Sequence, residues 1–182
     1  MANSEDSEII DSVVVRPEHR ASRGRLVPSR FDTVLVCGRE DMMHGTNGMY
    51  QMCLVYNITN HYPLAGNQIA QIRVVFQVPS CVIQNVFPNS NSPSYLAYVE
   101  WFTPLPQSSD PNHLMYKVSR LTDGGCRRSS IIPVESIISS VHLLPRFGLA
   151  TPRGWNSFSV LDLCNSLYVN LFNCWDSYLQ FK

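Results

Sequence analysis

The chain has 182 residues, of which 45% are hydrophobic and 15% charged, and its formal net charge is zero. This length suffices for one domain of ordinary size with a substantial core and with tails. The zero net charge excludes an overall electrostatic attraction to nucleic acid or to acidic membranes, so any such attraction must come from charge that is gathered locally.

No targeting segment is evident in the sequence. Its start is polar and acidic and lacks the basic residues and the apolar run of a secretory signal. No stretch approaches the roughly 20 apolar residues of a membrane helix. We expect a nuclear or cytoplasmic protein that is not secreted and does not contact a membrane. In that setting the cysteines are expected to be reduced and buried.

Residues 1–30 are expected to form a flexible arm, because they carry too little apolar surface to offset the entropy of ordering. Arginines spaced among small residues suit contacts with phosphate groups, whose strength falls steeply with salt. The alternatives are a solvated linker or a nuclear-localisation patch. The candidate nucleic-acid contacts in this arm are Arg16, Arg20, Arg23 and Arg25.

From residue 31 onward the pattern is typical of β-strands. Alternating apolar residues and intervening turns predict strands over 31–36, 49–59, 68–79, 95–104 and 113–121. In the third of these strands, alternation places Ile72, Val74 and Phe76 on one face and Gln71 and Arg73 on the other.

The stretch "TDGGCRRSS", residues 122–130, carries the Asp-Gly-Gly signal of a tight hairpin. Its basic residues Arg127 and Arg128 are further candidates for nucleic-acid contact, although a solvated or phosphorylated turn is the alternative. Pro133 then suggests an edge strand or the start of a strand. Short strands separated by turns predict that residues 31–182 form a single domain, a small antiparallel β-barrel.

The last third of the chain predicts a helix packed on this barrel. Val160, Leu161, Cys164 and Leu167 follow helical spacing, and a serine at 157 or 159 is a plausible N-cap. After residue 165 the β-branched and aromatic residues favour an extended segment.

The stretch "YLAYVEWFTPLP", residues 95–106, leaves two interpretations open. In a strand, Tyr98, Glu100 and Phe102 share one face, while Trp101 lies on the other. The aromatic residues could be ordinary core. Alternatively, two rings beside a carboxylate could bind a peptide through a methylated lysine or arginine. We take Tyr98, Glu100, Trp101 and Phe102 as the candidate peptide-binding surface.

The sequence offers little that indicates catalysis. Histidines and cysteines do not fall at zinc-ligand spacing, and neither a nucleophile elbow nor a phosphate-binding glycine loop is present. A thiol–imidazole pair, with Cys53 or Cys81 beside His61 or His142, stays open. We expect no metal, no cofactor and no catalytic residue.

Several stretches between residues 31 and 173 resemble the C-terminal module of proteins encoded by basidiomycete DNA transposons of the Plavaka and KDZ type. The stretches are "AQIRVVFQVP", "LAYVEWFTPLP", "LMYKVSR", "SIIPVESIISSVHLLPRFG" and "VLDLCNSLYVNLFN". More loosely, "AYVEWFTP" and the strand before it look like the core of bromo-adjacent homology (BAH) domains.

These resemblances imply a β-barrel module of chromatin that binds histone tails or other proteins and has no activity of its own. Transposon proteins of this type carry their nuclease in a separate domain, and the scattered acids of this chain do not form a two-metal site. Our hypothesis is a non-catalytic module bound to chromatin or nucleic acid. The alternatives are an assembly subunit that acts through the aromatic stretch 171–181, and a small enzyme with dispersed residues.

Overall fold

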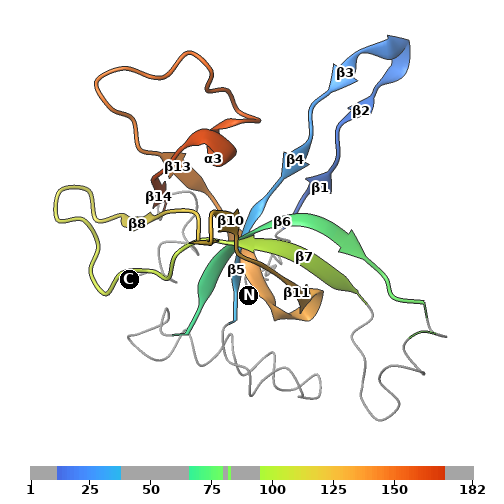
Figure 1. Ribbon diagram of the computed structural model, residues 1–182, viewed down its shortest axis with the longest axis horizontal. Helices are drawn as coiled ribbons and strands as arrows, with labels where there is room; N and C mark the ends of the chain where they lie inside the picture. Colours follow the sequence, from blue (N-terminus) through green and yellow to red (C-terminus); the bar gives the residue numbers. More distant parts are fainter. Residues whose placement is uncertain (1–11, 38–65, 80–81, 83–94, 171–182) are drawn as a thin grey trace, which may run out of the picture.

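The computed structural model describes residues 12–37, 66–79, 82 and 95–170 (Figure 1). The predicted strand over residues 49–59 and the aromatic stretch 171–181 lie outside the described residues. The described part is mainly β, as the sequence predicts, and consists of several antiparallel sheets.

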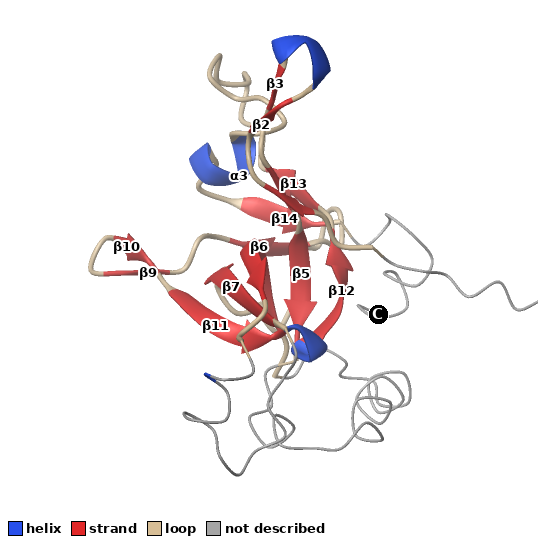
Figure 2. Ribbon diagram, turned by 90° about the vertical axis from the view of Figure 1, so that its right-hand side faces the viewer, coloured by secondary structure: helices blue, strands red, loops and turns tan. Residues whose placement is uncertain are grey.

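The largest sheet has five antiparallel strands. In the order in which they pair, these are β11 (Ser129–Pro133), β7 (Leu96–Trp101), β6 (Gln68–Phe76), β5 (Thr33–Val36) and β12 (Ile137–Val141). The two edge strands, β11 and β12, are joined by only the 3 residues of the 3-10 turn η3 (Val134–Ser136). Such a short connection requires the sheet to curl until its edges approach each other, as Figure 2 shows. No ladder joins β11 to β12 in the described part, so the predicted closed barrel is not observed.

Both faces of the five-stranded sheet carry buried side chains, which explains why apolar residues occur at consecutive positions in its central strands. The inner face of the curl is lined by Val34, Val36, Ala70, Ile72, Ala97, Val99 and Ile132. The outer face contributes Leu35 and Ile69 to a second core, which also includes Phe102, the residue directly after β7.

The second core is completed by a three-stranded antiparallel sheet and a short helix. The sheet consists of β13 (Leu143–Pro145), β14 (Leu167–Val169) and β8 (Tyr116–Val118). Val118, Leu143, Leu167 and Val169 pack against the outer face of the larger sheet. The extended segment that the sequence predicts after residue 165 is therefore present as β14.

The predicted hairpin at "TDGGCRRSS" is confirmed. Strands β9 (Thr122–Asp123) and β10 (Cys126–Arg127) pair across Gly124 and Gly125, whose φ angles are 56° and 84°. Positive φ at both central residues gives the tight turn a twist that suits the flanking strands. The prediction for Pro133 is confirmed too, because this residue ends the edge strand β11, where a missing N–H donor is tolerated.

The helix α3 (Val160–Leu163) is shorter than the sequence predicts. It ends after 4 residues, where Cys164 takes the extended conformation. Leu167, which helical spacing placed on the same face, instead pairs with Val118 and Pro145 in β14. Pairing with two neighbouring strands outweighs the weak helical preference of one more turn. Ser159 occupies the N-cap position, but its hydroxyl donates to the carbonyl of Gly154 and does not cap the helix.

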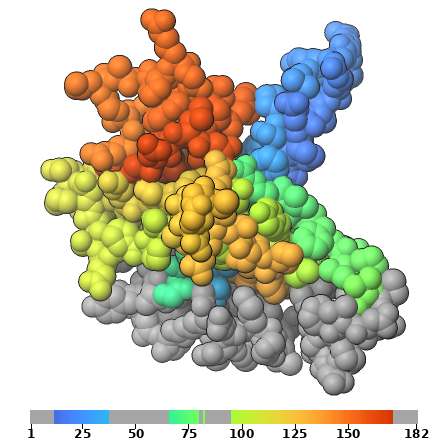
Figure 3. All heavy atoms as spheres, in the orientation of Figure 1, coloured from blue at the N-terminus to red at the C-terminus, as the bar shows by residue number. Residues whose placement is uncertain are grey.

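The described part of the predicted flexible arm is a two-stranded antiparallel ribbon. Strand β1 (Val15–Arg16) pairs with β4 (Arg30–Phe31), and β2 (His19–Arg20) pairs with β3 (Leu26–Val27). The ribbon, residues 15–31, stands clear of the body of the molecule (Figures 1 and 3). The ribbon differs from the expected arm because its two segments pair through backbone hydrogen bonds and because Val13 and Val15 at its base pack against the inner core.

Candidate nucleic-acid interface

The ribbon turns at its tip through the short 3-10 segment η1 (Ser22–Gly24). The amide of Ala21 donates to the carbonyl of Arg25 (2.8 Å), and the amide of Gly24 donates to the carbonyl of Ala21 (3.1 Å). Arg23 adopts φ 70°, an uncommon conformation for a residue with a side chain. These contacts fix the backbone of the tip, where Arg20, Arg23 and Arg25 are exposed.

Positive charge predominates along the ribbon. Glu18 is the only acidic residue between positions 15 and 31. The ribbon has five arginines, all of them exposed: Arg16, Arg20, Arg23, Arg25 and Arg30. Arg16 and Arg30 lie directly opposite each other on paired strands. Like charges in such positions repel, and an anion between them would remove the repulsion. Arg30 is partly neutralised by Asp32, with Nε 3.0 Å from Oδ1.

The sequence-predicted arginines of the β9–β10 hairpin have different surroundings. Arg128 is exposed. Arg127 is not free for phosphate, because its Nη1 lies 2.9 Å from Oε2 of Glu100 and 2.7 Å from Oδ1 of Asp162. The candidate contact Arg127 is therefore a structural residue in this fold.

Arg127 belongs to a charge cluster of five residues, which are Arg73, Glu100, Arg120, Arg127 and Asp162. Arg73 Nη2 lies 2.8 Å from Oε2 of Glu100 and 2.6 Å from Oδ1 of Asp162. Arg120 also contacts both carboxylates, at 3.6 Å and 3.2 Å respectively. The cluster joins helix α3 to β6, β7 and β10, and with three cations against two anions it carries one excess positive charge.

Burial and neighbouring charges compete in setting the pKa values of the cluster. Burial opposes ionisation of Glu100, but hydrogen bonds and charges from Arg73 and Arg127 outweigh it and hold its pKa below the usual value. The same balance lowers the pKa of Asp162. Burial lowers the pKa of Arg120 to about 10, and repulsion from Arg127 and Arg73 acts in the same direction. Glu100, Asp162 and Arg120 are therefore charged at neutral pH.

A β-bulge brings Arg73 into this cluster. The register between β6 and β7 shifts between Ile72, which pairs with Val99, and Val74, which pairs with Tyr98. The extra residue is Arg73, and it interrupts the alternation that the sequence predicts. As a result Ile72 is buried while Val74 is 49% exposed, so these two residues do not share a face as predicted.

The predicted peptide-binding surface is only partly exposed. Phe102 is completely buried, and the guanidinium of Arg120 lies over its ring at 4.4 Å. The cation–π contact expected of a ligand is thus made by the chain itself, and Glu100 is occupied by arginines. For these two residues the prediction of a ligand-binding surface is wrong. Trp101 is half-buried against the inner core and donates to the hydroxyl of Ser130, whereas Tyr98 is at the surface.

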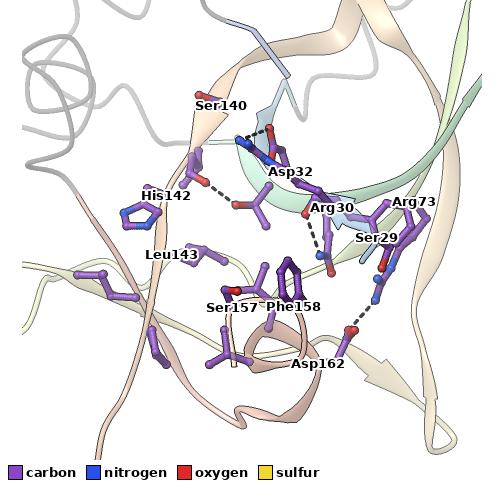
Figure 4. A pocket seen from close by; sticks show the side chains of 18 of the residues that line it. Ser29, Arg30, Asp32, Arg73, Ser140, His142, Leu143, Ser157, Phe158 and Asp162 are labelled. Atoms are coloured by element: carbon purple, nitrogen blue, oxygen red, sulfur yellow. Dashed lines mark hydrogen bonds and ion pairs between the residues drawn. The ribbon is translucent and has the colours of Figure 1, made fainter. Parts of the chain in front are cut away.

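A cavity of about 550 Å³ lies beside the charge cluster and the base of the ribbon. Its walls come from the ribbon base, β6, the β12–β13 segment and helix α3 with the turn before it (Figure 4). Arg73 and Asp162 form part of its rim, so the cluster and the cavity share a boundary. The sequence gives no sign of this cavity, because its walls are distant in the chain.

Comparison of the chain with family models, curated proteins and solved structures finds no match. The resemblance to transposon-encoded proteins and to BAH domains therefore stays a prediction. No helix in the described ranges is long and apolar enough to cross a membrane. The described residues also hold no group of three or more His, Cys, Asp or Glu side chains placed to bind a metal ion.

Proposed function

We propose that this chain is a non-catalytic module that binds duplex nucleic acid, in chromatin or in the context of a mobile element, through its arginine-rich ribbon. The observation that carries the proposal is a protruding two-stranded ribbon with five exposed arginines and a single acidic residue. The major groove of DNA, about 12 Å wide, admits a two-stranded ribbon of this kind. Arginine side chains supply the phosphate contacts.

The architecture of the body agrees with a binding role for the five-stranded sheet. The curled five-stranded sheet, with β11 and β12 joined by η3, is compatible with the BAH-like barrel that the sequence resemblance implies. A binding role also agrees with the state of the carboxylates at the cavity. Asp162 is paired with arginines, and Asp32 accepts from Arg30 and from the amide of Val14 at 2.7 Å. Neither carboxylate is left as a general base.

The proposal is tested by replacing the three arginines nearest the ribbon tip, Arg20, Arg23 and Arg25, with glutamine. The matched control replaces three exposed cations elsewhere, Lys117, Arg146 and Arg153, and changes the net charge equally. At low salt the ribbon variant is expected to bind duplex DNA at least about tenfold more weakly, while the control binds like the wild type. An equal weakening in both variants would contradict a role of the ribbon.

Protein binding by the sheet is a second candidate function, and a specific observation favours it. Val74, Tyr98 and Ile131 lie side by side on three neighbouring strands and are 49%, 36% and 59% exposed. Such adjoining apolar groups are typical of contacts with a peptide or protein. If these three side chains contact the partner, the substitution Ile131→Asp should abolish binding to a histone-tail peptide array. Unchanged binding would exclude this surface as the contact.

A further inference from the structure

The cavity beside the ribbon is lined by both polar and apolar residues. Leu143, Val160 and Leu161 form part of its lining, and Phe158 contributes an aromatic ring that is 55% exposed. Its volume of about 550 Å³ falls within the roughly 300–1,000 Å³ range of sites for small organic groups. The cavity therefore has room for a ring system with an apolar face.

The charged side chains that line the cavity are all paired. Arg30 pairs with Asp32 at 3.0 Å, and Arg73 pairs with Asp162 at 2.6 Å. Figure 4 shows both pairs at the edge of the cavity. The lining itself holds two cations and two anions, and the charge cluster to which Arg73 and Asp162 belong adds one excess positive charge, so the cavity does not select an ammonium group.

The remaining polar residues of the lining carry hydroxyl, amide or imidazole groups. The lining includes the residues Ser12, Ser29, Ser157 and His142. Nδ1 of the His142 ring lies 3.0 Å from the side-chain nitrogen of Asn170, so Nε2 is the ring atom left for a ligand. Hydroxyl and imidazole groups both donate and accept hydrogen bonds. They suit an uncharged, planar group with donors and acceptors on its edge.

We propose that the cavity binds one unpaired nucleobase of a nucleic acid whose duplex part is held by the ribbon. A nucleobase is planar, uncharged and bordered by donors and acceptors, and it stacks on aromatic side chains in a sequence-tolerant way. The location supports this ligand, because Ser29, Arg30 and Phe31 at the base of the ribbon form one wall of the cavity. A strand bound at the base of the ribbon would thus lie next to the cavity. This inference rests on the proposed function of the ribbon.

The test compares three DNA duplexes of equal length: one fully paired, one with a single unpaired nucleotide, and one with an abasic site in place of that nucleotide. Fluorescence anisotropy gives their affinities for the full chain. We expect the unpaired base to raise affinity about tenfold over the abasic duplex, which has the same phosphate charge. Equal affinity for these two duplexes would overturn the proposal.

Two phenylalanines make a matched pair of variants. Phe158→Ala should abolish the preference for the unpaired base and leave the affinity for the fully paired duplex unchanged. Phe147→Ala removes a ring that is similarly exposed, at 58%, but does not line the cavity, and it should keep the preference. A preference that survives in Phe158→Ala would contradict the assignment.

A nucleoside titration separates failure of the cavity proposal from failure of the ribbon proposal. If none of the duplexes binds, the ribbon proposal is wrong, and the cavity is still tested by adding adenosine or cytidine to the protein. Binding in the cavity should shift the NMR signals of the His142 ring in the wild type but not in Phe158→Ala. Signals that do not move at millimolar nucleoside would overturn the nucleobase site.

Discussion

Nη2 of Arg73 lies 2.8 Å from Oε2 of Glu100, and this contact depends on the bulge that makes Arg73 an extra residue in β6. Each of the two residues has a second partner in the cluster, since Arg73 also reaches Asp162 and Glu100 also accepts from Arg127. The pair therefore links the sheet both to helix α3 and to the β9–β10 hairpin.

The charge balance of the cluster predicts that removing an anion costs more stability than removing a cation. Glu100→Gln leaves three arginines around one carboxylate and should lower the free energy of unfolding by about 3 kcal/mol. Arg127→Gln leaves two charges of each sign, at a position with a more exposed side chain, and should cost about 1 kcal/mol. Urea denaturation of both variants measures the difference. Equal costs would show that the excess positive charge does not matter.

The lowered pKa values of Glu100 and Asp162 predict a loss of stability in acid. A carboxyl whose pKa is lower in the folded state stabilises the fold above its unfolded pKa, near 4, and loses that contribution as the pH falls through the folded value. Wild-type protein should thus become less stable between about pH 4 and pH 2. The Glu100→Gln variant should lose less stability over that pH interval. Thermal melts at several pH values can check this. A parallel decline in both proteins would argue against the assignment.

Burial of Phe102 predicts a strong dependence of stability on its ring. Phe102→Ala removes a fully buried phenyl group and its contact with Arg120, and should cost about 3–5 kcal/mol. Phe147→Ala, at an exposed site, should change stability by about 0.5 kcal/mol. Chemical denaturation distinguishes these values. A small effect at Phe102 would mean that the ring is accessible, and it would restore the hypothesis of an open aromatic surface.

The turn of the β9–β10 hairpin predicts a requirement for glycine. Gly125 has φ 84° and open space around its Cα, so Gly125→Ala tests backbone strain without a steric clash. We expect a loss of about 1 kcal/mol. Gly148 also has open space but no positive φ, and Gly148→Ala should be neutral or slightly stabilising. If both variants behave alike in thermal unfolding, the strain argument fails.

Local sequence signals predicted the features of the fold that depend on interactions between residues close together in the sequence. Asp-Gly-Gly marked the hairpin turn, Pro133 marked an edge strand, and the apolar runs marked β5, β6 and β7. Each of these features follows from the backbone preferences of a few neighbouring residues. The length of the helix was overestimated, because helical spacing alone does not show that Leu167 pairs with two strands.

The candidate site was harder to predict, because its parts meet over long distances in the chain. Alternation placed Glu100 and Phe102 correctly beside each other but could not show that Arg73, Arg120 and Arg127 would surround them. A bulge has no reliable sequence signature, so the position of Arg73 was missed. The arginines of the ribbon were identified from composition, whereas the pairing that arranges them was not.

The central claim is that the ribbon holds duplex nucleic acid through its arginines, and the salt dependence of binding tests it most directly. Each arginine–phosphate interaction that a substitution removes should make the slope of log K against log salt concentration shallower by about 0.9. The Arg20, Arg23 and Arg25 to glutamine variant should therefore have a slope smaller in magnitude by about 2–3 than that of the wild type. The control variant at Lys117, Arg146 and Arg153 should keep the wild-type slope. A ribbon variant with the wild-type slope, or a wild type whose binding does not depend on salt, would contradict the account.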